Sequence, residues 1–94
     1  MQTTNDYQID VRGNAARGYG VWVSSTNGGG PPKHLSFRYF DELKACLTET
    51  LLFPRPSIAR VKDALESHNS FRETATLDYA VVEQFHRECE SRFR

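Results

Sequence analysis

The residues of this chain that could do acid–base or metal chemistry are few and scattered. The 94-residue sequence contains three histidines and two cysteines. Only His86 and Cys89 stand at a short spacing, which on a helix would place both side chains on one face. One pair of ligands is not a metal site, because a structural zinc ion takes four. We interpret these two residues, together with Cys46 and His68, as core or boundary positions of helices, and we predict no metal and no cofactor.

A second set of residues would suit metal-free cleavage of RNA. His34 can exchange protons near neutral pH, and Arg12 or Arg38 can stabilise the charge that develops on a phosphorane, with Asp10 as the acid. The set has no specific spacing. The sequence also lacks a nucleophile elbow, a zinc-protease motif and a cysteine near a plausible base. We therefore predict no catalytic residue and keep a ribonuclease as a third hypothesis.

The composition predicts one soluble globular domain, residues 1–94, with 38% apolar and 26% charged residues. Twelve cations balance twelve acids, so the protein as a whole does not attract nucleic acid or an anionic membrane. The charge is nevertheless uneven along the chain. The stretch from Val11 to Phe40 contains four cations and no acid, and the cations are Arg12, Arg17, Lys33 and Arg38. Any attraction of anions is therefore expected to be local.

No apolar run reaches the roughly 18 to 20 residues that span a bilayer, and no basic region followed by an apolar stretch opens the sequence. We expect neither membrane insertion nor secretion. Both cysteines fall inside helical patterns, which favours reduced thiols and a cytoplasmic location.

Alternating apolar and polar residues predict three β-strands, over about 7–12, 19–25 and 33–39. Glycines and prolines between them predict hairpin loops at 13–18 and 24–33, and the conformation of the second, longer loop is left open. The apolar set that should face the interior is Tyr7, Ile9, Val11, Val21, Val23, Leu35 and Phe37.

After residue 40 the hydrophobic period becomes 3.6, and it predicts helices over about 41–52 and 57–68. Asp41 and Ser57 are the expected N-caps. Pro54 and the proline two residues later should separate the two helices, because proline cannot donate the backbone hydrogen bond.

The strongest helical pattern covers about 77–93, where the inward stripe would be Leu77, Val81, Phe85 and Cys89. Residues 70–76 are predicted to be a connector, and whether they are helical is left open. A neighbouring stripe of this last helix could instead pair with a second copy of the chain, as a homodimer. That stripe is Tyr79, Val82, His86, Cys89 and Phe93.

These elements predict an α+β fold, a three-stranded antiparallel sheet covered on one face by helices. Alternation then assigns the opposite, outward face of the sheet to Gln8, Asp10, Arg12, Trp22, Ser24, His34, Ser36 and Arg38. Tryptophan and arginine are enriched where surfaces bind partners, so the predicted partner-binding residues are Arg12, Trp22, His34 and Arg38. The alternative is that the long loop or the last helix covers Trp22 and the arginines only form a solvated shell around it.

The order of three short strands and a helix, with Gly20-Val21-Trp22-Val23 on the second strand and Leu35-Ser36-Phe37 leading into Phe40-Asp41-Glu42-Leu43, resembles two DNA-binding families. These are the plant AP2 domain and the N-terminal domain of tyrosine integrases. The resemblance covers about residues 7–52 and implies a sheet that lies in the major groove. It implies that Arg12, Trp22 and Arg38 contact DNA.

The second resemblance extends further along the chain. Strands, the segment Phe40-Asp41-Glu42-Leu43, a turn with Pro54 and Pro56, and the segment Ile58 to Leu65 resemble small phage-encoded anti-CRISPR inhibitors of type I systems. This resemblance implies a non-enzymatic protein, from a phage or mobile element, that occludes a site on a host complex. The resemblance does not assign a functional role to any residue of this chain.

The sequence thus supports three functional hypotheses. The first is a small protein-binding module, an inhibitor or adaptor with a protein partner. The second is binding of DNA or RNA by the same basic and aromatic face, and the third is the ribonuclease.

Overall fold

The computed structural model describes residues 4–26 and 32–92. The α+β class and the antiparallel sheet are confirmed, but the sheet has four strands and not three. The elements in chain order are β1 (Thr4–Asn14), β2 (Gly18–Ser25), β3 (Lys33–Phe37), α1 (Phe40–Ala45), the π-helical turn η1 (Cys46–Thr50), α2 (Arg55–His68), β4 (Ser70–Asp78) and α3 (Tyr79–Arg92). Residues 27–31 of the predicted second loop lie outside the described residues.

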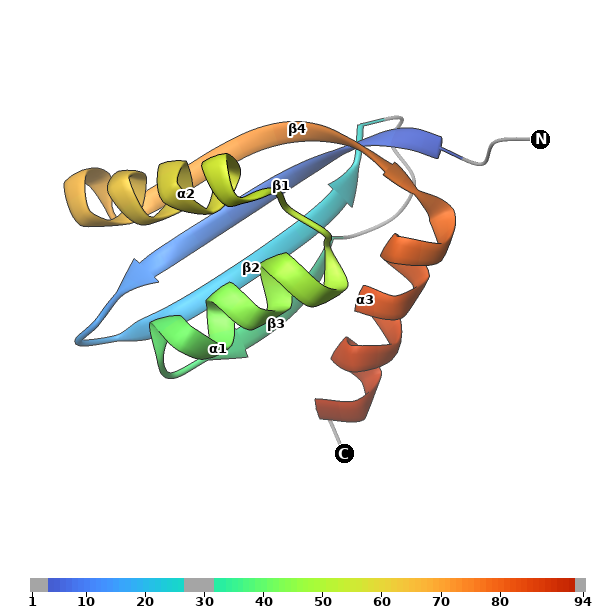
Figure 1. Ribbon diagram of the computed structural model, residues 1–94. Coiled ribbons are helices and arrows are strands. Elements are labelled where there is room, and N and C mark those ends of the chain that lie inside the picture. The colour runs from blue at the N-terminus through green and yellow to red at the C-terminus, as the bar shows by residue number, and fades with distance from the viewer. Residues whose placement is uncertain (1–3, 27–31, 93–94) are drawn as a thin grey trace.

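The strands lie in the order β3-β2-β1-β4, and every neighbouring pair is antiparallel. Helices α1 and α2 lie in front of one face of this sheet, and α3 runs from the end of β4 past β3 and η1 (Figure 1). No helix in the described part of the chain is both long enough and apolar enough to cross a membrane.

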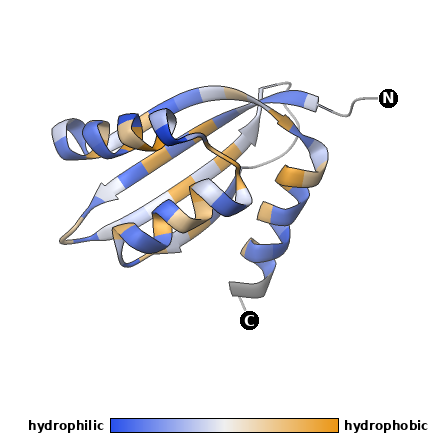
Figure 2. Ribbon diagram, viewed as in Figure 1, coloured by the Kyte–Doolittle hydropathy of each residue, from blue (hydrophilic) through white to orange (hydrophobic). Residues whose placement is uncertain are grey.

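The predicted phase of the strands is correct. Hydrophobic and hydrophilic positions alternate along β1 and β2 (Figure 2). All seven predicted inward side chains are buried, and Ile9, Val11 and Val21 are fully so. Against them pack Leu43 of α1, Val61 of α2 and residues of α3. At about 1.5 to 3 kcal/mol for each large apolar side chain, this burial is the main stabilisation of the fold.

Strand β4 is the element that the sequence interpretation missed, since residues 70–76 were expected to form a connector. Its burial alternates, with Phe71, Ala75 and Leu77 packed against the core. The inward position between them is Glu73, a charged residue that interrupts the apolar pattern. β4 is an edge strand, where an inward-pointing charge is tolerated.

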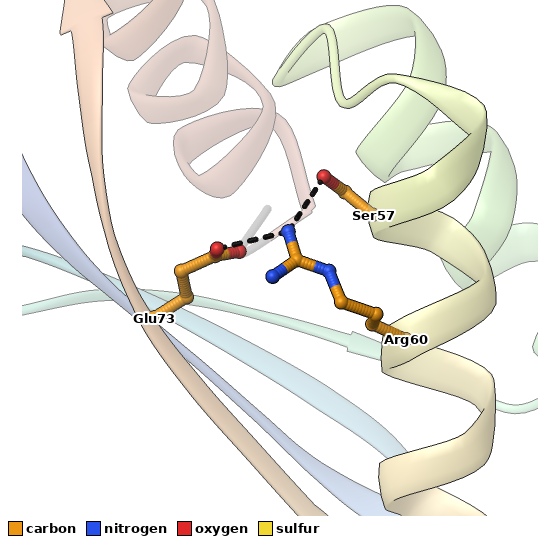
Figure 3. Close-up of polar contacts among 3 residues, drawn as sticks. All are labelled: Ser57, Arg60 and Glu73. Carbon is orange, nitrogen blue, oxygen red and sulfur yellow. Dashed lines mark hydrogen bonds and ion pairs between the residues drawn. The ribbon is translucent and has the colours of Figure 1, made fainter.

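The charge of Glu73 is compensated by α2. Arg60 donates to the carboxylate of Glu73 at 3.0 Å and to the hydroxyl of Ser57 at 3.1 Å (Figure 3). The arginine and serine lie one turn apart on the helix and thus link α2 to β4. This tertiary contact, which the local sequence does not reveal, compensates the charge at the inward position of the strand.

The helix starts differ from the prediction. α1 begins at Phe40, so Asp41 lies in its first turn and is not the N-cap. α2 begins at Arg55 after Pro54, which places Ser57 inside the helix instead of at its cap. Proline is compatible with a first turn because its missing N–H would have no helical partner there. At the other end of α2, His68 is exposed and does not face the core as its place in the pattern suggested.

The first predicted helix, 41–52, is shorter and changes its winding. η1 closes with a bond from the Leu51 N–H to the Cys46 carbonyl, five residues back, and the Phe53 N–H donates to the Leu47 carbonyl at 2.8 Å. Between these bonds Leu52 takes φ 57°, and its side chain is 63% exposed. A left-handed leucine costs about 1 to 2 kcal/mol. This conformation accompanies the burial of both neighbours, Leu51 and Phe53.

Helix α3 begins at Tyr79, two residues later than predicted, and packs into the core of its own chain. Val82, Phe85 and Cys89 are buried there, which leaves Val82 and Cys89 unavailable to a second copy of the chain. Tyr79 is 56% exposed. Phe93 lies outside the described residues.

Removal of the ring that anchors α3 should therefore destabilise the monomer. Phe85→Ala is expected to lower the free energy of unfolding by about 3 to 5 kcal/mol, because it leaves a cavity beside the sheet. Phe85→Leu should cost less than about 1.5 kcal/mol. Tyr79→Ala, on the exposed side of the same helix, should change stability by less than about 0.5 kcal/mol. Urea denaturation followed by circular dichroism measures all three, and equal effects of Phe85→Ala and Tyr79→Ala would contradict this packing.

The fold should also be sensitive to pH through His86 of α3. Burial, and then the charge of Lys33, lower the pKa of His86 from 6.5, against the opposing effect of Glu90 and Glu83. The folded state therefore disfavours the protonated imidazole. This contribution to stability is present above the unfolded pKa and is lost as the pH falls toward the folded pKa.

Urea midpoints measured between about pH 7.5 and about pH 5.5 should fall more steeply for the parent protein than for His86→Gln, which has no imidazole to protonate. If the urea midpoints of the two proteins fell equally with pH, His86 would not couple protonation to folding.

Candidate functional site

The sheet face opposite the helices is the candidate site. In the described part of the chain no helix packs on it, and its side chains follow the register of the four strands. One row across the sheet reads His34, Trp22, Asp10 and Arg72, and the next row reads Ser36, Gly20, Arg12 and Ser70. We call the surface formed by these eight residues the open face.

Trp22, on the central strand β2, is half-buried between two side chains of the open face. The His34 ring stacks on the indole with centroids 4.4 Å apart and planes inclined by 17°. The Arg12 guanidinium carbon lies 5.8 Å from the centroid of the same indole. His34 belongs to β3 and Arg12 to β1, the strands on either side of β2, so the indole is flanked from both sides. Stacking and cation–π attraction hold it in place.

Gly20 provides the space that this arrangement needs. A Cβ atom at Gly20 would lie 2.6 Å from Cη2 and 2.8 Å from Cζ3 of Trp22, and 3.0 Å from Nε2 of His34. The outer edge of the indole therefore rests against bare backbone. A glycine two residues before an outward tryptophan is on the same strand face, and this spacing is the signal in the sequence that could have revealed the contact.

An open hollow of about 530 Å³ adjoins the stack at the β1–β2 turn. Its lining contains the cations Arg12 and Arg17, together with His34 and Ser36, and no acidic residue. Arg17 was recognised in the sequence as part of the basic stretch but not as a site residue. The turn that carries it is fixed by Asn14, whose Oδ1 accepts the backbone N–H groups of Ala16 and Arg17 at 3.0 and 2.8 Å. We call the hollow beside this turn the basic hollow.

The nearest acid on the open face is already paired. Asp10 accepts a hydrogen bond from Arg72 Nε at 2.6 Å and one from the Gln8 amide at 3.2 Å. Arg72 lies on β4, so it could not be assigned to this face while β4 was interpreted as a connector. This pairing leaves Arg12 and Arg17 as the charges that face the basic hollow.

The structure brings together three of the four predicted partner-binding residues. Arg12, Trp22 and His34 form the stack. Arg38 lies just beyond β3, and its guanidinium carbon sits 5.6 Å from the ring centroid of Tyr39. Arg38 and Tyr39 thus form a separate exposed pair.

The four residues of the ribonuclease hypothesis are not assembled around one point. Trp22 separates Asp10 from His34 in their row, and Asp10 is paired with Arg72. Arg38 contacts Tyr39 instead. His34 Nε2 is hydrogen-bonded to the Ser36 hydroxyl at 3.1 Å.

The potential metal ligands are also dispersed. Cys46 and Cys89 are buried in the core, and His68 is exposed at the end of α2. Within residues 4–26 and 32–92, no group of three or more His, Cys, Asp or Glu side chains could hold a metal ion.

Gly20→Ala should displace the indole while the fold persists. The chain contains one tryptophan, so its fluorescence reports on this site alone. The added methyl group would push the ring outward, and we expect a red-shifted emission. The overpacking should cost about 1 to 3 kcal/mol, of which about 0.5 to 1 kcal/mol is offset because alanine is preferred to glycine inside a strand. Ser24→Ala, on the same strand and face, is the control and should leave the emission unchanged. Unaltered emission in Gly20→Ala would show that the indole does not rest on Gly20.

In the comparisons with known proteins, no family model matches the chain, and neither a curated protein nor a solved structure is significantly similar to it.

Proposed function

We propose that this chain is a non-enzymatic, cytoplasmic protein-binding module, an inhibitor or adaptor, and that the open face is its contact surface. The observation that carries the proposal is the position of Trp22, exposed in part on a sheet face that no helix within residues 4–26 and 32–92 covers, with His34 and Arg12 packed against it. Tryptophan and arginine dominate the binding energy of protein interfaces. An anchor that is already fixed loses little conformational entropy on binding.

The arrangement of the indole favours a protein over a nucleic acid. Proteins that bind single strands stack bases on free aromatic faces. Here the imidazole already stacks on Trp22, and the guanidinium of Arg12 lies over the same ring system. What remains accessible is the edge of a packed cluster, which suits a side-chain contact.

The charges of the sheet support the same choice. Arg12 and Arg17 make one end of this surface basic. At the other end, Asp6 accepts a hydrogen bond from Thr76 at 2.6 Å, and Asp78 lies in the row beyond. A polyanion would be attracted at one end and repelled at the other. A protein whose surface carries the complementary pattern of charges can bind both the basic and the acidic end.

We propose that the partner places an acidic side chain in the basic hollow, next to the Trp22 edge. Guanidinium groups bind carboxylates through paired, charge-assisted hydrogen bonds. The lining offers Arg12 and Arg17 and no acid that would compete for them. An inhibitor that occludes a site on a host complex, as the anti-CRISPR resemblance implies, would use such a surface.

The test is affinity capture from cell extract with and without nuclease, followed by affinity measurements on the captured protein. Trp22→Ala should weaken binding by about 30-fold or more, the equivalent of about 2 kcal/mol at a central tryptophan. Arg17→Glu should also weaken it. Tyr79→Ala removes an aromatic side chain that is 56% exposed on α3, and it should bind as the parent does.

Equal affinities of Trp22→Ala and the parent would overturn the assignment of the open face. Loss of capture on nuclease treatment would instead favour the nucleic-acid hypothesis. Direct binding of DNA or RNA would then have to fall steeply between about 50 and about 200 mM salt, as counterion release requires.

A further inference from the structure

The helix layer contains a groove that the proposed function does not use. A hollow of about 690 Å³ lies between α1 and α2, and it is lined by Phe40, Asp41, Lys44, Thr48, Phe53, Arg55, Ile58, Ala59 and Lys62. A second hollow, of about 360 Å³, shares Phe40 and Lys62 with the first, but its lining also contains the acid Glu66. It borders the basic hollow through Asn14, Tyr19 and Asn69, which line both. We call the larger hollow alone the helix groove. The helices that form it cover the sheet face opposite the open face (Figure 1).

The floor of the helix groove is apolar. Phe53 and Ile58 are buried core residues that also line it, and Phe40 is half-buried. Ala59 is exposed on the same side of α2, where its short side chain leaves the floor open.

The rim of the groove is mostly cationic. Lys44 stands on α1, and Arg55 and Lys62 stand on α2. All three are exposed, and none is in an ion pair with another residue of the described ranges. In the larger hollow they face one acid, Asp41. Lys62 also lies one turn from Glu66 on α2, outside this groove. The groove therefore combines a hydrophobic floor with a net excess of positive charge.

The segment that connects α1 to α2 has an unusual backbone conformation. It passes through the π-helical turn η1 and then through Leu52, which is left-handed and 63% exposed. Both features recur near functional sites, where surrounding structure maintains them. Next along the chain are Phe53 in the floor and Arg55 in the rim.

We propose that the helix groove binds an acidic amphipathic helix of a partner protein. Grooves between two helices accept a third helix through apolar residues at helical spacing, which here would fill the floor over Phe53 and Ile58. Acidic residues flanking that stripe would meet Lys44, Arg55 and Lys62. With a second ligand on the open face, the chain would act as an adaptor that holds two partners on opposite sides. The groove is argued from its own residues and does not rest on the proposed function of the open face.

The test is a selection of random peptides of about 16 residues, long enough to form a helix when bound, displayed and panned on the folded protein. The enriched sequences should be acidic, with apolar residues spaced three and four apart. Their affinity for the double variant Lys44→Glu/Lys62→Glu should fall at least tenfold. Ala59→Arg, which adds bulk to the floor without removing positive charge, should also weaken binding.

Arg17→Glu is the matched control, since it reverses a charge in the basic hollow and leaves the helix groove intact. It should not alter binding of the selected peptides. The proposal is overturned if no peptide family is enriched, if the enriched peptides are not acidic, or if Arg17→Glu weakens their binding as much as Lys44→Glu/Lys62→Glu does. That last result would place the peptides on the open face. Circular dichroism of each variant verifies that it is folded.

Discussion

The structure depends on the burial of one face of β1 and β2 beneath the helices. Ile9, Val11 and Val21 are removed entirely from water, and side chains alternate strictly along a strand. A shift of one residue in phase would exchange the two faces and expose the core. The same constraint that fixes the interior therefore directs Trp22 to the opposite side, where no described helix covers it.

Because the Trp22 side chain points away from the core, its neighbours on the open face determine how the indole packs and which part of it a partner can contact. Gly20 lets the ring lie close to the backbone, and His34 and Arg12 flank it from adjacent strands. Each of these residues is held by the sheet and not by a loop, which makes the cluster rigid. The ion pair between Asp10 and Arg72 removes the one acid of this row from competition for the basic hollow. The result is a small, ordered surface in a protein with no net charge.

The phase of the first three strands and the existence of three helices could be predicted from the sequence, because period-two and 3.6-residue patterns are local. β4 could not, since Glu73 occupies an inward position and interrupts the apolar pattern, and its partner Arg60 comes from a different element, α2. For the same reason Arg72 was not assigned to the open face. Arg38 was placed on that face by extending the alternation beyond Phe37, where β3 ends, and it contacts Tyr39 instead. The π-helical turn and the left-handed Leu52 have no local signature in the sequence.

The central claim is that a protein partner contacts the edge of Trp22 on the open face. Since the chain has one tryptophan, its indole N–H gives a single resonance in a nitrogen–proton NMR spectrum. Addition of the captured partner should shift or broaden this resonance together with the backbone signal of His34, while the methyl signals of Val61, on the buried side of α2, stay in place. An unchanged indole resonance in the presence of saturating partner, with changes elsewhere in the spectrum, would contradict the account.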